Sequence, residues 1–123
     1  MTYLSPTEIL YIHNRLVDEM RVTHGIESVP VLKKVTKYIH NNEMFPDKFS
    51  KAAALFFAVA KKKPFKDINI ATALFITKVF LDLNKTDFEI ERPEIQDFIR
   101  NGLPRTTLEE IKSMIIQNSR ANL

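Results

Sequence analysis

Two long, almost continuous apolar segments, separated by a short loop, constrain the fold of this chain more than any other feature. Residues 48–62 read KFSKAAALFFAVAKK and residues 69–83 read NIATALFITKVFLDL, so apolar side chains occupy nearly every side of each segment. A helix that is hydrophobic all round is buried by its neighbours. The first helix must end near Lys63, because the residue before Pro64 disfavours helical geometry. The sequence therefore predicts two buried central helices.

Shorter amphipathic segments flank this pair. In the first of them, apolar residues and His13 recur with helical spacing from Ile9 to Met20. Three of these segments and the first central helix open with residues that favour the start of a helix. These start signals are Ser5-Pro6-Thr7-Glu8, Ser28 with Pro30, Asp47 after Pro46, and Thr106 or Thr107 with Glu109 or Glu110 three residues on.

Together the segments predict an all-α fold, a compact bundle of about six helices around the two central ones. We expect a single domain over residues 1–123, because the chain has the length of one domain and contains no linker. Residues 88–90 could form a short extended piece, but no strand pattern is strong enough to build a sheet. We expect the tail, residues 118–123, to be frayed.

The composition excludes several classes of function. The chain has no cysteine, so it can form neither disulfides nor thiolate metal sites, which fits the cytoplasm, where we expect it to reside. Two glycines, Gly25 and Gly102, cannot make a Gly-rich phosphate loop. No apolar run reaches the roughly 18 residues of a membrane span, so no membrane partner is expected. A net charge of +3 allows an acidic partner without requiring one.

Several segments resemble the Doc (death-on-curing)/Fic family, in the same order and with the same spacing. Residues 3–10, YLSPTEIL, with His13 following, resemble the opening helix of Doc-type toxins. Residues 49–60 resemble the buried helix that precedes the family's active-site loop. Residues 63–73, KPFKDINIATA, fall where the family carries His-Pro-Phe-any-Asp-Gly-Asn-Lys-Arg-Thr-Ala. The resemblance covers about residues 3–90 and implies a Fic/Doc-like helical fold.

Departures from that signature bear on function. The resemblance implies a histidine that acts as general base on the target hydroxyl, and an arginine that holds nucleotide phosphates. Lys63 stands in place of the histidine and Ala71 in place of the arginine. Ile70 replaces the signature lysine, and Ile68 replaces the glycine beside the phosphate-binding backbone. The positions that match the signature are Pro64, Phe65, Asp67, Asn69, Thr72 and Ala73.

Elementary chemistry disfavours catalysis by this version of the motif. A general base works best with a pKa near the working pH, whereas lysine starts near 10.4. Positioned positive charge at the phosphates can contribute ~10³ or more in rate, and Ala71 supplies none. The branched side chain of Ile68 is also expected to resist the positive-φ backbone that glycine permits. We therefore expect no catalytic residues, and only vestigial motif positions at Lys63, Asp67, Asn69 and Ala71.

Asp67 and Asn69 have two interpretations each. The resemblance implies that Asp67 binds magnesium, but an acidic residue there would also serve as the N-cap of the helix that starts at Asn69. Asn69 could likewise be a structural loop residue. His13, His24 and His40 lack metal-ligand spacing, so structural or surface roles are favoured. We expect no metal site, or Asp67 alone if there is one.

A cluster of lysines surrounds the loop, and its members are candidates for binding a partner. One interpretation is a solvated helix end, where cations complement the C-terminal helix dipole. The other is a basic docking patch for an acidic partner. Nucleic acid is not expected there, because no helix-turn-helix spacing or basic helix accompanies the cluster. The candidates are Lys61, Lys62, Lys63 and Lys66.

Two functions follow. The first is a catalytically inactive Doc-like protein that acts by protein–protein binding, a regulator derived from a toxin–antitoxin or mobile-element system of a phage or plasmid. Its partner would be an antitoxin-like protein or a host or phage regulator, and no cofactor is expected. The alternative is a divergent enzyme that uses ATP and magnesium to transfer phosphate or a nucleotide to a protein hydroxyl. The oligomeric state is left open.

Overall fold

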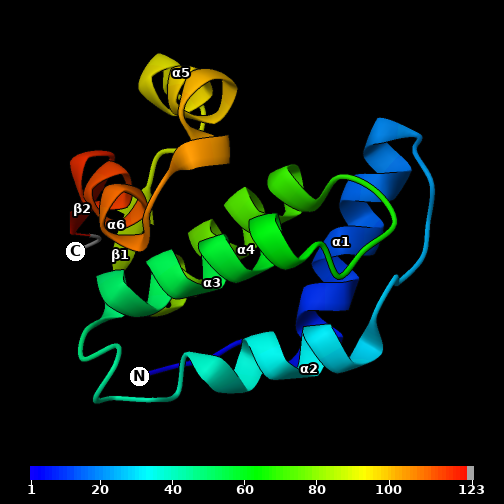
Figure 1. Ribbon diagram of the computed structural model, residues 1–123, viewed down its shortest axis with the longest axis horizontal. Helices are drawn as coiled ribbons and strands as arrows, with labels where there is room; N and C mark the ends of the chain where they lie inside the picture. Colours follow the sequence, from blue (N-terminus) through cyan, green and yellow to red (C-terminus); the bar gives the residue numbers. More distant parts are fainter. Residues whose placement is uncertain (122–123) are drawn as a thin grey trace.

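The computed structural model describes residues 1–121 and confirms the predicted all-α bundle (Figure 1). Six α-helices, one short 3-10 helix and two short strands make up this part of the chain. In chain order they are α1 (Pro6–Met20), α2 (Val29–Tyr38), α3 (Lys48–Lys62), α4 (Asn69–Leu83), β1 (Thr86–Phe88), α5 (Pro93–Asn101), η1 (Leu103–Arg105), α6 (Leu108–Gln117) and β2 (Ser119–Ala121).

Helices α3 and α4 form the predicted buried pair. They pack against each other more extensively than any other two elements. Figure 1 shows them side by side in the middle of the molecule, with the remaining helices around them. Six consecutive residues of α3, from Lys51 to Phe56, are buried, so the burial extends around the whole helix. The apolar surface that these residues remove from water is the main force that holds the bundle together.

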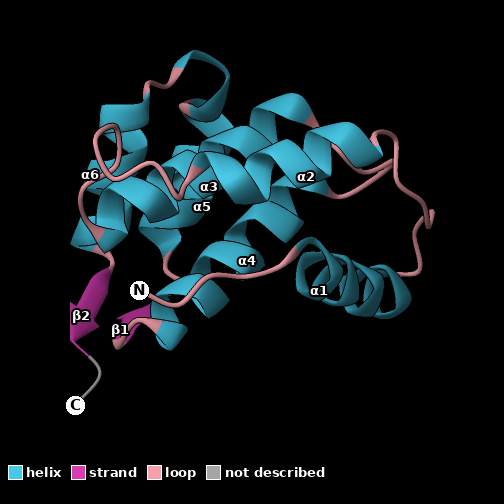
Figure 2. Ribbon diagram, turned by 90° about the horizontal axis from the view of Figure 1, so that it is seen from below, coloured by secondary structure: helices cyan, strands magenta, loops and turns pink. Residues whose placement is uncertain are grey.

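The flanking helices cover different sides of this pair. Helix α1 packs on α4, whereas α2 and α6 pack on α3. Figure 2 shows α1 at one end of the bundle and the two strands at the other. No helix within residues 1–121 is long and apolar enough to cross a membrane.

The predicted helix starts are confirmed by their capping hydrogen bonds. Ser5 and Glu8 form a reciprocal capping box, in which each side chain accepts a hydrogen bond from the other residue's backbone N–H. Ser28, Asp47 and Thr107 cap α2, α3 and α6 through side-chain oxygens. Each such cap satisfies a backbone donor that the first turn of a helix leaves unpaired.

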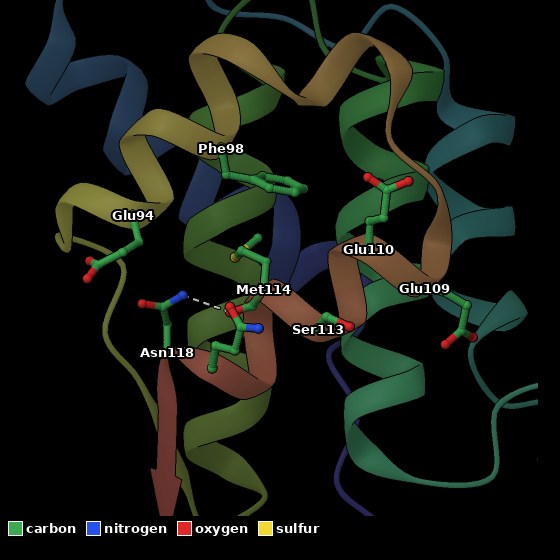
Figure 3. A pocket seen from close by; sticks show the side chains of 8 residues that line it. Glu94, Phe98, Glu109, Glu110, Ser113, Met114 and Asn118 are labelled. Carbon is green, nitrogen blue, oxygen red and sulfur yellow. Dashed lines mark hydrogen bonds between the residues drawn. The ribbon is translucent and has the colours of Figure 1, made fainter.

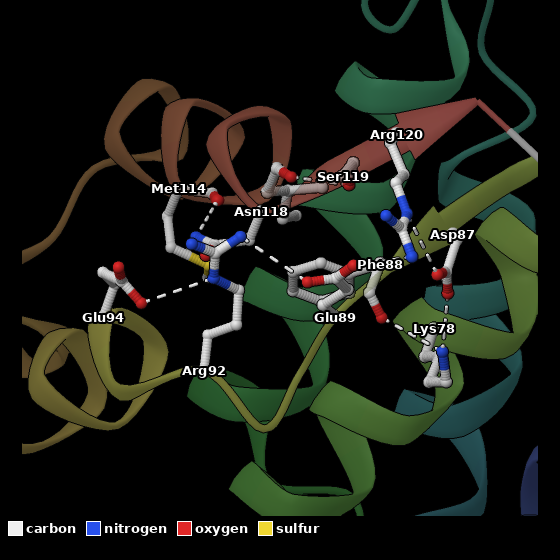
Figure 4. Close-up of polar contacts among 11 residues, drawn as sticks. Lys78, Asp87, Phe88, Glu89, Arg92, Glu94, Met114, Asn118, Ser119 and Arg120 are labelled. Atoms are coloured by element: carbon white, nitrogen blue, oxygen red, sulfur yellow. Dashed lines mark hydrogen bonds and ion pairs between the residues drawn. The ribbon is translucent and has the colours of Figure 1, made fainter.

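The chain end departs from the prediction of a frayed tail. Residues 119–121 pair antiparallel with residues 86–88 in a two-stranded sheet, although we expected no sheet. Asn118 is buried, and its side-chain amide donates to the Met114 carbonyl. Arg120 lies beside the carboxylates of Asp87 and Glu89 (Figure 4). The frayed-tail prediction was therefore wrong for residues 118–121, and residues 122–123 lie outside the described part.

Candidate functional site

The signature loop, residues 63–69, joins the two central helices and contains two left-handed turns. Lys63 ends α3 with φ 49° and ψ 62°, and Ile68 precedes α4 with φ 50° and ψ 40°. The prediction that Ile68 would resist positive φ was wrong. A left-handed conformation costs an L-residue about 1–2 kcal/mol, and a β-branched residue there is an outlier. The loop geometry is therefore retained by surrounding contacts, against the preference of the residue itself.

Asn69 provides two of those contacts. Its side-chain Oδ1 accepts from the Phe65 N–H at 3.0 Å, and its Nδ2 donates to the Phe65 carbonyl at 3.0 Å. One amide thus satisfies both backbone groups of a residue whose side chain is buried. Of the two interpretations of Asn69, the structural one describes the contacts that the side chain makes.

Asp67 also contacts the backbone, but not as predicted. Its Oδ1 accepts from the Ile68 N–H at 2.8 Å. The N-cap position belongs to Ile68, whose side chain cannot accept a hydrogen bond, so the N-cap prediction for Asp67 was wrong. Helix α4 starts at Asn69, as predicted, and Ile68 is the residue immediately before it. No side chain caps the first turn of α4.

His13 lies beneath the loop and was not predicted as part of it. Its side chain is fully buried, and its ring stacks on Phe65 at 3.7 Å between centroids with a 9° interplanar angle. His13 Nδ1 and Thr72 Oγ1 lie 3.0 Å apart and share a hydrogen bond, whereas His13 Nε2 has no partner. Its position in the apolar stripe of the first helix was the signal that could have placed it in the core.

Burial also affects the ionisation of His13. It is the largest cause lowering the pKa of the imidazole, and the nearby His24 lowers it further. The Asp67 carboxylate opposes the shift. His13 is therefore held toward its neutral form, as expected for a ring whose charged form would lose its hydration.

A strap, defined as residues 25–28, runs along the outer edge of the signature loop. The N–H groups of Glu27 and Ser28 donate to the Pro64 carbonyl at 2.7 and 3.1 Å, and the Lys66 N–H donates to the Gly25 carbonyl at 3.1 Å. Gly25 has φ +134°, and a Cβ there would lie 2.9 Å from Lys66 Cδ. The glycine thus permits both the turn and the close approach of the lysine stem.

The four candidate lysines do not form one uniform surface. Lys61 is half-buried, and its Nζ donates to the Leu103 carbonyl at 2.5 Å. Lys62 and Lys63 are exposed, whereas the stem of exposed Lys66 lies against Gly25. The part of the predicted patch that faces solvent is therefore Lys62, Lys63 and the ammonium end of Lys66.

The positions that changed in the signature are at the surface. Ile70 exposes 37% of its area and Ala71 is half-buried, so neither substitution fills a core position. Elsewhere, His24 pairs with exposed Asp18 at 2.9 Å, and the His40 ring stacks on Tyr3. Within residues 1–121, no group of three or more His, Asp and Glu side chains could hold a metal ion.

A separate pocket of about 320 Å³ lies between α5 and α6 and includes no residue of the signature loop. Figure 3 shows Phe98 and Met114 with the carboxylates of Glu94, Glu109 and Glu110 around them. Thr107 donates to the Glu110 carboxylate, so part of this acidic rim belongs to the cap of α6.

Comparison with known proteins and protein families identifies the family of this chain. No curated protein matches the chain. A model of the Fic/DOC family matches residues 3–81, which is more than half of the 123 residues. The match includes α1, α3, the whole signature loop and all but the last two residues of α4. The chain belongs to the Fic/DOC family.

Proposed function

We propose that this Fic/DOC protein is catalytically inactive and acts by binding another protein. One observation carries the proposal: the retained signature residues hold the loop backbone, while the two positions that would act on substrate have changed. The side chains of Asn69 and Asp67 both form hydrogen bonds with neighbouring backbone groups. Lys63 and Ala71 occupy the positions of the base and of the phosphate-holding arginine.

The setting of Lys63 supports this interpretation. A lysine serves as a general base or nucleophile when a desolvated or strongly cationic environment lowers its pKa. Lys63 is an exposed residue at the C-terminus of α3, a position that favours a positive charge. Its role as a helix-terminating cation is therefore better supported than a role as a base.

The partner would meet the exposed surface around the loop. Lys62, Lys63 and Lys66 give this surface a positive charge, and Ile70 adds an apolar side chain beside them. A partner with acidic and apolar residues matches it. By resemblance to Doc-type toxins, we propose an antitoxin-like protein or a host or phage regulator, encountered in the cytoplasm. No cofactor enters this mechanism.

One observation favours the alternative, a divergent enzyme. Ile68 adopts the left-handed conformation that the signature glycine would provide, and α4 begins without a side-chain cap. Free N–H groups at a helix N-terminus can bind an anion such as a phosphate. Under this alternative ATP would lie there with magnesium on Asp67, and the product would be a phosphorylated or nucleotidylated protein hydroxyl.

A transfer assay separates the two functions. Purified protein would be incubated with host extract and ATP labelled at either the α- or the γ-phosphate. We expect no protein-dependent labelling. A matched variant with Lys63→His, Ile68→Gly, Ile70→Lys and Ala71→Arg restores the signature and shows whether the remaining scaffold supports transfer. Labelling by the wild type that Asp67→Ala abolishes would overturn the proposal in favour of the enzyme.

A pull-down tests the binding function itself. We expect the wild type to capture a specific partner from extract of its host. A variant with glutamine in place of Lys62, Lys63 and Lys66 should capture the partner more weakly, because the surface would lose its positive charge. A partner retained at full strength by this variant would exclude the loop surface as the binding site.

A further inference from the structure

A second basic surface lies in a groove between the N-terminal segment and α2. Figure 1 shows these two segments side by side. The groove has a volume of about 550 Å³. One wall is formed by the chain from Tyr3 to Pro6 together with Glu8. The other is formed by Lys33 and Lys37 of α2 and by His40, which follows the helix. No residue of the signature loop lines it.

Internal contacts hold both walls of this groove in place. The Tyr3 ring stacks on His40 at 3.7 Å between centroids, and the Lys51 ammonium lies 5.5 Å from the centre of the same ring. Leu4 is buried, and the Thr36 hydroxyl donates to the Lys33 carbonyl within α2. A preformed groove lowers the entropic cost of binding, because few side chains need to be ordered.

The basic wall presents two free ammonium groups. Lys33 and Lys37 are four residues apart, so they project from the same side of α2, about 5–6 Å apart at Cβ. Both are exposed, and within residues 1–121 neither has an ion-pair partner. His40 follows at the end of the same wall. The spacing suits two carboxylates on one side of an extended or helical segment.

The wall opposite the two lysines favours a peptide ligand over a nucleic acid. The Glu8 carboxylate lines the groove, where its Oε1 accepts from the Ser5 N–H at 3.0 Å in the capping box. A uniformly charged phosphate chain would meet this carboxylate and be repelled. A peptide can place acidic residues toward the lysines and an apolar residue toward Tyr3 and Pro6. The groove therefore favours a peptide over a nucleic acid.

We propose that this groove binds an acidic, partly apolar peptide segment of a partner protein, with Lys33 and Lys37 pairing with its carboxylates. The site is distinct from the signature loop. Tyr3 approaches Phe80 near the end of α4, at 6.2 Å between ring centroids, whereas the loop precedes the start of α4. The inference thus does not depend on whether the signature loop is catalytic.

Nuclear magnetic resonance with ¹⁵N-labelled full-length protein tests the proposal, with the synthetic peptide acetyl-EELEEL-amide as probe. We expect saturable shifts at the amides of Ser5, Lys33, Thr36 and His40. The double variant Lys33→Gln/Lys37→Gln should weaken binding at least tenfold. Lys34→Gln is the matched control, because Lys34 is exposed on the same helix but does not line the groove; it should change affinity less than twofold.

Three results would overturn the proposal. They are shifts centred on the signature loop, equal weakening by Lys34→Gln, and a thymidine oligonucleotide that competes for the same amides. Thermal melting of each variant checks that its fold is intact. If the double variant melts early, Lys37→Glu alone replaces it, and undiminished binding by that variant would equally contradict the assignment.

Discussion

The two ends of the central helix pair differ in the contacts of their polar side chains. At the closed end, where α3 begins and α4 ends, Lys51 and Asn84 each make several hydrogen bonds, although the buried Thr86 hydroxyl has no partner and Lys85 has positive φ. Lys51 is 1% exposed, yet its Nζ donates to the Ile39 carbonyl at 2.6 Å and to Asn42 Oδ1 at 2.8 Å. The Asn84 side-chain oxygen accepts a hydrogen bond from the Thr2 N–H, and its amide nitrogen donates to the carbonyls of Thr2 and Phe80. The hydrogen bonds at this end stabilise the fold.

The loop end, where α3 ends and α4 begins, combines strain with unmet hydrogen bonds. Lys63 and Ile68 both have positive φ, His13 Nε2 has no partner, and α4 lacks a side-chain cap. Backbone strain persists only where the surroundings enforce it, and it concentrates at functional sites. From this comparison we propose that the signature loop is a former functional site in which the residues that would act on substrate have changed.

The largest expected effect is at the closed end. Lys51→Ala should lower the free energy of unfolding by about 3–4 kcal/mol, because it removes two hydrogen bonds to a charged group and leaves a cavity. Urea denaturation followed by circular dichroism measures it. Exposed Lys34→Ala is the control and should change stability by less than about 0.5 kcal/mol. A loss below about 1 kcal/mol for Lys51→Ala would refute the description of this end.

At the loop end, Asn69→Ala should cost about 2 kcal/mol. The substitution leaves the N–H and carbonyl of Phe65 without their side-chain partners. The same denaturation experiment measures it, and Asn69→Asp separates the two bonds, since it keeps an acceptor for the N–H and loses the donor. If Asn69→Ala matched the wild type in stability, the clamp on Phe65 would have no energetic role.

Acid should weaken the loop end through His13. Its pKa is lowered in the folded protein by burial, so the unfolded chain binds the proton more tightly. Stability is then fully present above the ordinary histidine pKa near 6.5 and falls as the pH drops below it, by at most about 1.4 kcal/mol per pH unit. Chemical denaturation between pH 7.5 and 5 should show a shallower fall for His13→Gln. Identical slopes in both proteins would remove His13 as the cause.

The smallest expected effect on stability tests the backbone strain at Ile68. Ile68→Gly should leave the free energy of unfolding unchanged or raise it by about 1 kcal/mol, because glycine adopts positive φ without a steric cost. Ile70→Gly, two residues into α4, should instead lower it by about 1 kcal/mol, since glycine is a poor helix former. Equal destabilisation by both substitutions would show that Ile68 is not strained.

Much of the fold could be predicted from the sequence, because its signals are local. The apolar runs placed α3 and α4, and capping residues such as Ser5 and Asp47 placed helix starts, since each acts on its own first turn. The strand at residues 119–121 was missed, because three residues without alternating polarity pair with a distant segment. Such pairing depends on tertiary context.

The candidate site was harder to predict, for the same reason. The loop was located from its motif, but the conformation of Ile68 was predicted wrongly because surrounding contacts override its intrinsic preference. Lys51 gave no signal within an alanine-rich run, since its partners lie on the segment after α2. His13 lay on the predicted apolar stripe, but its contacts with Phe65 and Thr72 cross 52 and 59 positions of sequence.

Calorimetric titration of ATP with magnesium into the wild-type protein tests the central proposal most directly, that the signature loop no longer supports nucleotide chemistry. Ala71→Arg provides the matched comparison, because it restores the phosphate-holding side chain. We predict no saturable heat for the wild type. Saturable binding by the wild type that Asp67→Ala abolishes would contradict the account and show that the nucleotide site has survived.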